Sequence, residues 1–495
     1  MRFFALGLLA MAACSPTGPV AVFPKSFQFG FATIAYQSEG SLRGDGTRVA
    51  SNWSEWDELG KIKGGQHNDH GNGFFEGYTT DLDLAASLGA NAFSYAIDWA
   101  RLEPAPGVFD DAELGRIVAI VQAMRARKLR PVIVMFHWVT PTWVQSPKQG
   151  IDLLSRSDRA FAEAFVPLVD HVVPALAGLV DDWLTFEEPY SIVGAEYLAG
   201  LHPPGKFLDI KSSQRALVNL MYLHARTYHH IHQLDTQDAD GDGVAAFVGF
   251  ENLALESVPL DATSPDDVQA AKHFDYIVNH QFMKGIWEGD IDVDLDGRAD
   301  NLKTDPPEGH DEELRHTLDF IGLNYYQRMR VEAGGILSKV APFFGTPHLD
   351  VREYDTTLPH SDRYWEISSP GLRTVIEEYS KYGLPMNITE NGEADLDDDE
   401  RPFYILDHLR KAGEAIAAGY DIRGYYYWTI SDNFEWNDGI EPRYGLFQVD
   451  FTKPNFPRTR TPRAADVFEE VAKRGAIDRA LWDRIALPSY PVGPP

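Results

Sequence analysis

The chain is poor in cysteine and in basic residues, and both shortages limit what it can be. Cys14 is the one cysteine among 495 residues, so no disulfide can form within the chain. Lysine and arginine number 44 against 74 aspartates and glutamates, which gives a formal net charge of −30. Because nucleic-acid phosphates require a basic protein surface, this balance argues against a nucleic-acid partner.

Long apolar runs are also missing, except at the N-terminus. The run Phe3–Ala13 is too short to anchor the chain across a bilayer but is typical of a signal-peptide core. Small residues precede Cys14 and resemble the lipobox of bacterial lipoproteins, although Met11 stands where leucine is usual. We predict a signal peptide over 1–13, then a lipidated Cys14 that anchors the exported protein to a bacterial membrane (periplasmic or cell-surface), and a linker over 14–25. Ordinary secretion is the alternative.

The rest of the chain alternates strand-like apolar runs with amphipathic helical stretches. The stretch Ala112–Lys128 shows the helical pattern most clearly, with apolar residues recurring at three and four positions. Eight strand-like runs alternate with such helices, and they are Phe27–Ala35, Ala92–Asp98, Pro131–Phe136, Asp182–Phe186, Val244–Asn252, Asp319–Asn324, Pro385–Thr389 and Gly424–Trp428. This pattern predicts a single (β/α)8 TIM barrel over 26–475, with long loops at its C-terminal face and a C-terminal extension over 476–495.

Two acids stand at the ends of predicted strands. Glu188 follows the fourth strand in Thr185–Pro189, and Glu390 ends the seventh strand directly before an Asn-Gly turn. The carboxyl ends of barrel strands are where α/β barrels carry their catalytic residues. Two carboxylates meeting there suit glycoside cleavage, in which one protonates the leaving oxygen and the other attacks the anomeric carbon.

The residues around these acids resemble glycoside hydrolase family 1, the β-glucosidase and β-galactosidase family. The matching segments are Ser26–Gly40, His137–Trp143, Thr185–Pro189, Asp319–Tyr326, Ile388–Gly392 and Trp428–Trp436. The resemblance runs from about Phe27 to Phe468. It implies a retaining β-glycosidase that cleaves the terminal sugar from a small-molecule or oligosaccharide β-glycoside through a covalent glycosyl-enzyme. It also implies that catalysis needs no cofactor.

The same resemblance implies roles for individual residues. Glu188 takes the place of the acid/base and Glu390 that of the nucleophile. Polar side chains are expected to hold the sugar hydroxyls while an aromatic platform covers the C–H face of the ring. The expected substrate-binding residues are Gln37, His137, Glu187, Asn324, Tyr326, Trp428, Glu435 and Trp436.

Two departures from the family pattern make the predicted site more negative. Glu187 replaces the family's asparagine, and Ser94 aligns with an arginine that lies beside the nucleophile in relatives. Because neighbouring like charges raise the pKa of at least one group, we hypothesise that Glu187 and Glu390 share a proton. A compensating cation is the other explanation, supplied by Arg328, Arg330 or an amino group on the sugar. Two further functions stay open: a sugar-binding protein without turnover, and a glycosidase for a cationic or otherwise modified sugar.

Two acidic loops have carboxylates at alternate positions followed by glycine, a spacing that can wrap a hard cation. The candidate ligands are Asp238, Asp240 and Asp242 in the first loop, and Asp292, Asp294, Asp296 and Asp300 in the second. Neither loop has the glutamate that an EF-hand carries at position twelve. The hypothesis is structural calcium, and the alternative is a pair of solvated acidic turns.

Overall fold

The fold is described from a computed structural model that covers residues 18–335 and 345–485. The predicted signal peptide and Cys14 lie outside the described residues. Within those two ranges, no helix is both long enough and apolar enough to cross a membrane.

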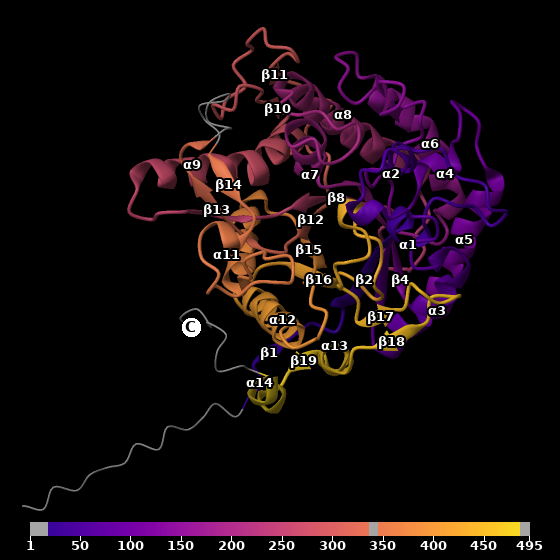
Figure 1. The fold of residues 1–495 in the computed structure, drawn as a ribbon, viewed down its shortest axis with the longest axis vertical. Coiled ribbons are helices and arrows are strands. Elements are labelled where there is room, and N and C mark those ends of the chain that lie inside the picture. Colours follow the sequence, from indigo (N-terminus) through magenta and orange to yellow (C-terminus); the bar gives the residue numbers. More distant parts are fainter. Residues whose placement is uncertain (1–17, 336–344, 486–495) are drawn as a thin grey trace, which may run out of the picture.

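Eight parallel strands close into a barrel with helices in a ring around it (Figure 1), which confirms the predicted fold. In chain order the strands are β2 (Gln28–Ile34), β3 (Ala92–Ala96), β4 (Arg130–Val134), β7 (Asp182–Glu187), β8 (Phe247–Leu253), β12 (Phe320–Asn324), β15 (Met386–Asn391) and β16 (Ile422–Tyr427). Each predicted strand-like run overlaps one of them. Strands β7 and β15 are buried at every position, because helices cover one face and the barrel interior the other.

The helical layer follows the predicted alternation and includes a further long helix after the last barrel strand. The main helices are α3 (Phe74–Ser87), α5 (Asp111–Ala126), α6 (Ala160–Leu176), α8 (Ile210–Leu234), α9 (Pro265–Asp275), α11 (Ser369–Tyr379), α12 (Arg401–Ala417) and α13 (Pro462–Arg474). Helix α13 is this further helix, and it packs against α12. It begins with a proline at its first turn and ends at Gly475 in a left-handed conformation, which are favourable start and stop residues for a helix.

The two ends of the barrel chain meet. Strand β1 (Ala21–Val22) pairs antiparallel with β19 (Ala476–Ile477), and helix α14 (Arg479–Ile485) follows. The predicted linker over 14–25 and the predicted extension over 476–495 therefore each contribute a strand to the fold. Their backbone groups satisfy each other here, as in the 2.7 Å bond from the Val20 amide to the Ile477 carbonyl.

The strand pairing is irregular at the C-terminal ends of the barrel. The β7–β8 register shifts just before Glu187, and the β12–β15 register shifts just before Asn324. A third shift, between β15 and β16, spans Glu390. Because a bulge re-aims the side chains beside it, these shifts turn the strand-end residues toward the mouth of the barrel.

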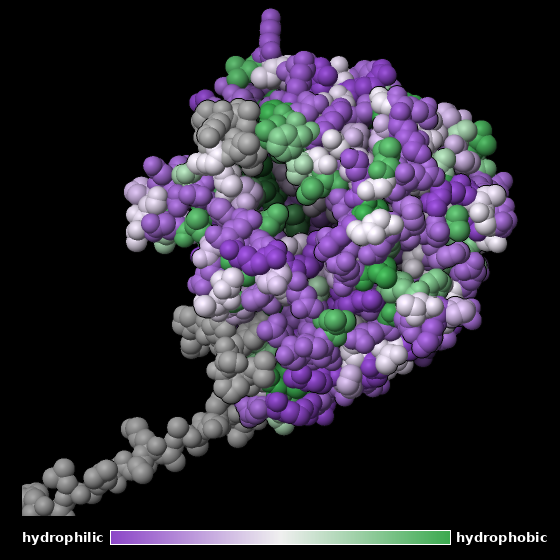
Figure 2. All heavy atoms as spheres, viewed as in Figure 1, coloured by the Kyte–Doolittle hydropathy of each residue, from purple (hydrophilic) through white to green (hydrophobic). Residues whose placement is uncertain are grey.

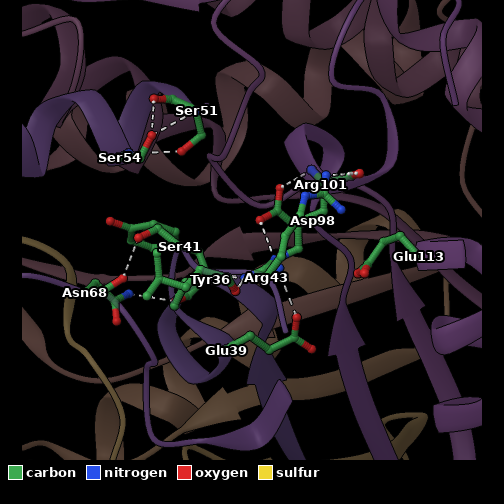
Figure 3. Close-up of polar contacts among 12 residues, drawn as sticks. Tyr36, Glu39, Ser41, Arg43, Ser51, Ser54, Asn68, Asp98, Arg101 and Glu113 are labelled. Carbon is green, nitrogen blue, oxygen red and sulfur yellow. Dashed lines mark hydrogen bonds and ion pairs between the residues drawn. The ribbon is translucent and has the colours of Figure 1, made fainter. Parts of the chain in front are cut away.

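A buried polar network holds the turn that follows β2 (Figure 3). Helix α1 (Ala35–Glu39) contains Gln37 and ends at Glu39, whose carboxylate lies 3.8 Å from Nε of Arg101. The Arg101 guanidinium is fully buried and also lies 3.5 Å from the carboxylate of Asp98. These ion pairs fix the turn, and with it the position of Gln37.

Candidate active site

The two predicted catalytic glutamates lie side by side at the mouth of the barrel. Glu188 follows β7 directly and has a left-handed backbone (φ 49°), while Glu390 is the penultimate residue of β15. One carboxylate oxygen from each of Glu187, Glu188 and Glu390 lies within 4.8 Å of the others. All three side chains are buried. Two catalytic carboxylates this close match a retaining glycosidase, whereas inverting enzymes separate theirs by about 6.5–9.5 Å.

Glu188 is held by two hydrogen-bond donors. Ser191 Oγ donates at 2.5 Å to one carboxylate oxygen, and Asn324 Nδ2 donates at 3.0 Å to the other. Burial raises the pKa of Glu188, and the two hydrogen bonds oppose that rise. A raised pKa keeps a proton on this carboxyl group, as an acid catalyst requires. Ser191 was not among the predicted residues, and its signal is local: it stands one helical turn after the acid.

Glu390 has a different set of neighbours. The Tyr326 hydroxyl donates a hydrogen bond to it. Burial raises the pKa of Glu390 well above its ordinary value, the negative charge of Glu188 raises it further, and the Tyr326 bond opposes both. Since two carboxylates so close do not both ionise readily, the resting pair retains a proton.

A cavity of about 730 Å³ opens at this end of the barrel, and Figure 2 shows it as a hollow in the surface. The predicted sugar-binding residues Gln37, Trp428 and Glu435 line it. The Trp428 indole N–H donates to the Glu435 carboxylate at 3.1 Å, and burial raises the pKa of Glu435 to about 7. Both amide atoms of the buried Gln37 lack a hydrogen-bond partner among the described residues, as sugar-binding groups do before a ligand arrives.

The remaining predicted contacts divide into two groups. His137, Tyr326 and Trp436 line the cavity, and the His137 and Trp436 rings stack with centroids 5.3 Å apart. Asn324 is not among the lining residues. It bonds to Glu187 and Glu188 and so orients both carboxylates, and its predicted contact with the sugar stays a prediction.

Comparisons with known proteins decide the family. The model of glycosyl hydrolase family 1 matches residues 20–476. The chain belongs to this family. It is 27% identical to a β-galactosidase from Pyrococcus woesei, covering 94% of this chain and 99% of the relative. It is 29% identical to a β-glucosidase from an Agrobacterium species, covering 88% of this chain and 93% of the relative.

Solved structures agree. A β-glycosidase from Pyrococcus horikoshii superimposes with a TM-score of 0.80 at 28% identity, covering 95% of this chain and 99% of that one. A β-glucosidase from Thermotoga maritima in complex with castanospermine gives a TM-score of 0.79 at 25% identity, covering 92% and 100%. The family assignment, the barrel and the retaining β-glycosidase reaction predicted from the sequence are thereby confirmed.

Glu187, the first departure in this family 1 chain, has neighbours other than those hypothesised. One of its oxygens touches Nδ1 of His137, and the other accepts a 2.8 Å hydrogen bond from Asn324. Two bare acceptors would repel, so the Glu187–His137 contact holds a proton. His137 is thus a second partner for a Glu187 proton, and the hypothesis that Glu187 and Glu390 share one stays a prediction, since their oxygens lie within 4.8 Å of each other.

The prediction that Arg328 or Arg330 compensates the extra negative charge of the site is contradicted. Arg328 pairs with Glu256 at 2.6 Å, and Arg330 pairs with Glu366 at 2.7 Å, on strand β13 (Arg328–Glu332) outside the barrel. Within the described ranges, Arg363 is the one lysine or arginine that lines the cavity. It pairs with Asp438 on the cavity wall.

The sequence analysis missed a further acid in the barrel interior. Glu251 on β8 lies beside Glu187 in the strand register and is 1% exposed, and its Oε1 has no hydrogen-bond partner among the described residues. Burial and the charges of Glu390 and Glu188 raise its pKa well above the ordinary value. It obeys the rule that identified Glu188 and Glu390, since it stands near the end of the predicted fifth strand.

Each acidic loop gathers only part of its predicted ligand set. Asp238 and Asp240 cluster with Asp181, while Arg130 pairs with Asp240 and lies 3.8 Å from Asp242. In the second loop the cluster consists of Asp292, Asp294 and Glu308. Asp296 pairs with Arg298, and the amide of Asp300 donates to Glu308. Asp181 and Glu308 come from elsewhere in the chain, so local spacing could not reveal them.

Proposed function

We propose that this family 1 chain hydrolyses the terminal β-linked glucose or galactose of a glycoside, with Glu390 as nucleophile and Glu188 as acid/base. The observation that carries the proposal is the approach of the two carboxylates within 4.8 Å. Glu390 attacks the anomeric carbon while the glycosidic C–O bond breaks and the leaving oxygen takes the Glu188 proton. Water then attacks the glycosyl-enzyme, returns a proton to Glu188 and frees Glu390.

A 2-fluoro β-glucoside with an activated leaving group tests these roles. It should label Glu390, and mass spectrometry of a digest should place the sugar there. Glu390→Gln should abolish labelling, whereas Glu188→Gln should still label when the leaving group needs no protonation. Binding of the sugar without any label or turnover would support the sugar-binding alternative instead.

We also propose structural calcium at the second acidic loop. The buried Asp292 and Glu308 form its core, and burial, with a smaller contribution from the Asp300 side chain, raises the pKa of Glu308. After the protein has been treated with a chelator, added calcium should raise its melting temperature. The rise should be smaller in Asp292→Asn. A melting temperature that does not respond to calcium would leave the loop a solvated acidic turn.

Export and lipidation at Cys14 belong to the proposal as well, on the strength of the small residues before that cysteine. Expressed from its full sequence, the protein should sediment with membranes and take up labelled palmitate. Cys14→Ala should be released to the soluble fraction. Release of the unaltered protein in the same way would favour ordinary secretion.

A further inference from the structure

The cavity is built from two chemically different halves. Its inner half is deeply buried and holds the acids together with the unpartnered amide of Gln37 and Nε2 of His137. Its outer half opens at a rim of exposed hydrophobic side chains, Phe207 at 66%, Leu201 at 57% and Leu349 at 49% exposure. The unpartnered polar groups thus make the inner half suitable for a sugar, whereas the apolar rim makes the outer half suitable for an apolar part of the ligand.

Buried apolar side chains from several segments of the chain also line the cavity. Val193 and Leu217 come from α7 (Pro189–Val193) and α8, Ile277 from the helical turn that follows α9, and Met329 from β13. Figure 2 shows hydrophobic residues on the sides of the hollow. A channel of this kind removes apolar surface from water when an apolar ligand enters it.

Three polar side chains that line the cavity are already bonded within the protein. The Gln281 amide donates to the Asp292 carbonyl at 2.5 Å, and the Gln214 amide donates to the Val293 carbonyl at 3.0 Å. The Ser213 hydroxyl donates to a carbonyl of its own helix at 2.7 Å. Hydroxyls of a second sugar would have to share these groups with the bonds they already make, whereas Gln37 in the inner half has both amide atoms unpartnered among the described residues. Gln327 keeps one unpartnered oxygen, but it directly follows Tyr326 and so lies near the acids.

We infer that the leaving group of the natural β-glycoside is a bulky apolar alcohol rather than a second sugar. This inference rests on the proposed function, because it places the glycosidic oxygen at Glu188 and the apolar group in the outer half of the cavity. The sugar occupies the inner half, where hydrogen-bonding groups are unpartnered. Hydrophobic burial of the leaving group then supplies binding energy that increases with its size.

The test compares glucosides that differ only in the leaving group. Methyl, butyl and octyl β-glucosides and cellobiose are assayed below the concentration at which the octyl compound forms micelles. Each buried methylene should raise kcat/KM about fourfold, so octyl should exceed methyl by at least about a hundredfold even if only half of the added methylenes are buried, and should exceed cellobiose. A flat alkyl series, or a preference for cellobiose, overturns the inference.

Two further assays distinguish a failure of this inference from a failure of the proposed glycosidase function. Hydrolysis of 4-nitrophenyl β-glucoside combined with a flat alkyl series leaves the glycosidase standing and rejects the apolar leaving group. If no glycoside is cleaved, calorimetry still tests the inference by comparing the affinities of the uncleavable octyl and methyl 1-thio-β-glucosides. An octyl-to-methyl affinity ratio of about a hundredfold supports the inference, and equal affinities overturn it.

Rim variants locate the effect on the structure. Leu201→Ser and Phe207→Ser should each lower the octyl-to-methyl ratio of kcat/KM by about threefold or more. Leu396 is 59% exposed, against 57% for Leu201, and does not line the cavity, so Leu396→Ser is the matched control and should keep the ratio. Unchanged ratios in both rim variants overturn the inference.

Discussion

The side-chain amide of Asn324 joins two neighbouring carboxylates: its Nδ2 donates to Glu187 at 2.8 Å and to Glu188 at 3.0 Å. Its own oxygen accepts a 2.8 Å hydrogen bond from the Thr389 hydroxyl, which fixes the orientation of the amide. One side chain on β12 thus sets the spacing of two acids at the end of β7. Asn324 is a positioning residue for Glu188.

Asn324→Ala should therefore change both rate and pH dependence. The amide bond lowers the pKa of Glu188, so its removal should raise that pKa and move the alkaline limb of the kcat/KM profile to higher pH. Loss of positioning should also lower kcat/KM, roughly tenfold to hundredfold. Thr389→Val, which only releases the amide, should give a smaller loss. An alkaline limb that stays in place in Asn324→Ala would contradict this role.

Glu187→Asn restores the amide that the family carries at this position. One Glu187 oxygen lies within 4.8 Å of oxygens of Glu188 and Glu390, so a negative charge on Glu187 would raise the pKa of both. Its replacement should move both limbs of the kcat/KM profile to lower pH. The surface variant Glu163→Gln is the control and should not move either limb. An unmoved profile in Glu187→Asn would mean that Glu187 is already neutral through the proton it shares with His137.

The sequence predicted the parts of the site that depend on local pattern. Glu188 and Glu390 stand at the ends of recognisable strands, and barrel topology brings strand ends together. The proximity of the two acids could therefore be predicted from the sequence. Side-chain direction decides which groups Glu187, Arg328 and Arg330 contact. A register shift sets that direction for Glu187, and a strand outside the barrel sets it for the two arginines. Neither feature leaves a local pattern in the sequence. The apolar outer half of the cavity could not be predicted either, because its lining residues come from segments far apart in the sequence and no local pattern marks them.

Glu435 should make sugar binding depend on pH near neutrality. Burial raises its pKa to about 7, and the positive charge of Arg363 limits that rise. The ionised carboxylate accepts hydrogen bonds from sugar hydroxyls, so affinity for methyl 1-thio-β-glucoside should increase as pH rises through about 7. Arg363→Gln should move this midpoint to higher pH, and Glu435→Gln should abolish it. Calorimetry across pH checks both, and an unmoved midpoint in Arg363→Gln would refute the coupling.

Glu251 gives a prediction about stability rather than rate. Its folded-state pKa lies well above the ordinary 4.5, because burial and the charges of Glu390 and Glu188 disfavour its ionised form. For an acid shifted this way, the stabilising contribution is fully present below the unfolded-state pKa and is lost as pH rises through the folded-state pKa. Glu251→Gln resembles the neutral acid and cannot ionise.

The unfolding free energy of Glu251→Gln, relative to the unaltered protein, should therefore rise as pH increases from the unfolded-state pKa of Glu251 to its folded-state pKa. The expected gain is about 1.4 kcal/mol for each pH unit between the two pKa values. Thermal unfolding at several pH values measures it, and Glu163→Gln should show no such trend. A difference that stays constant across this range would mean that Glu251 ionises in the folded protein as easily as in water, and that the acids around it do not repel its charge.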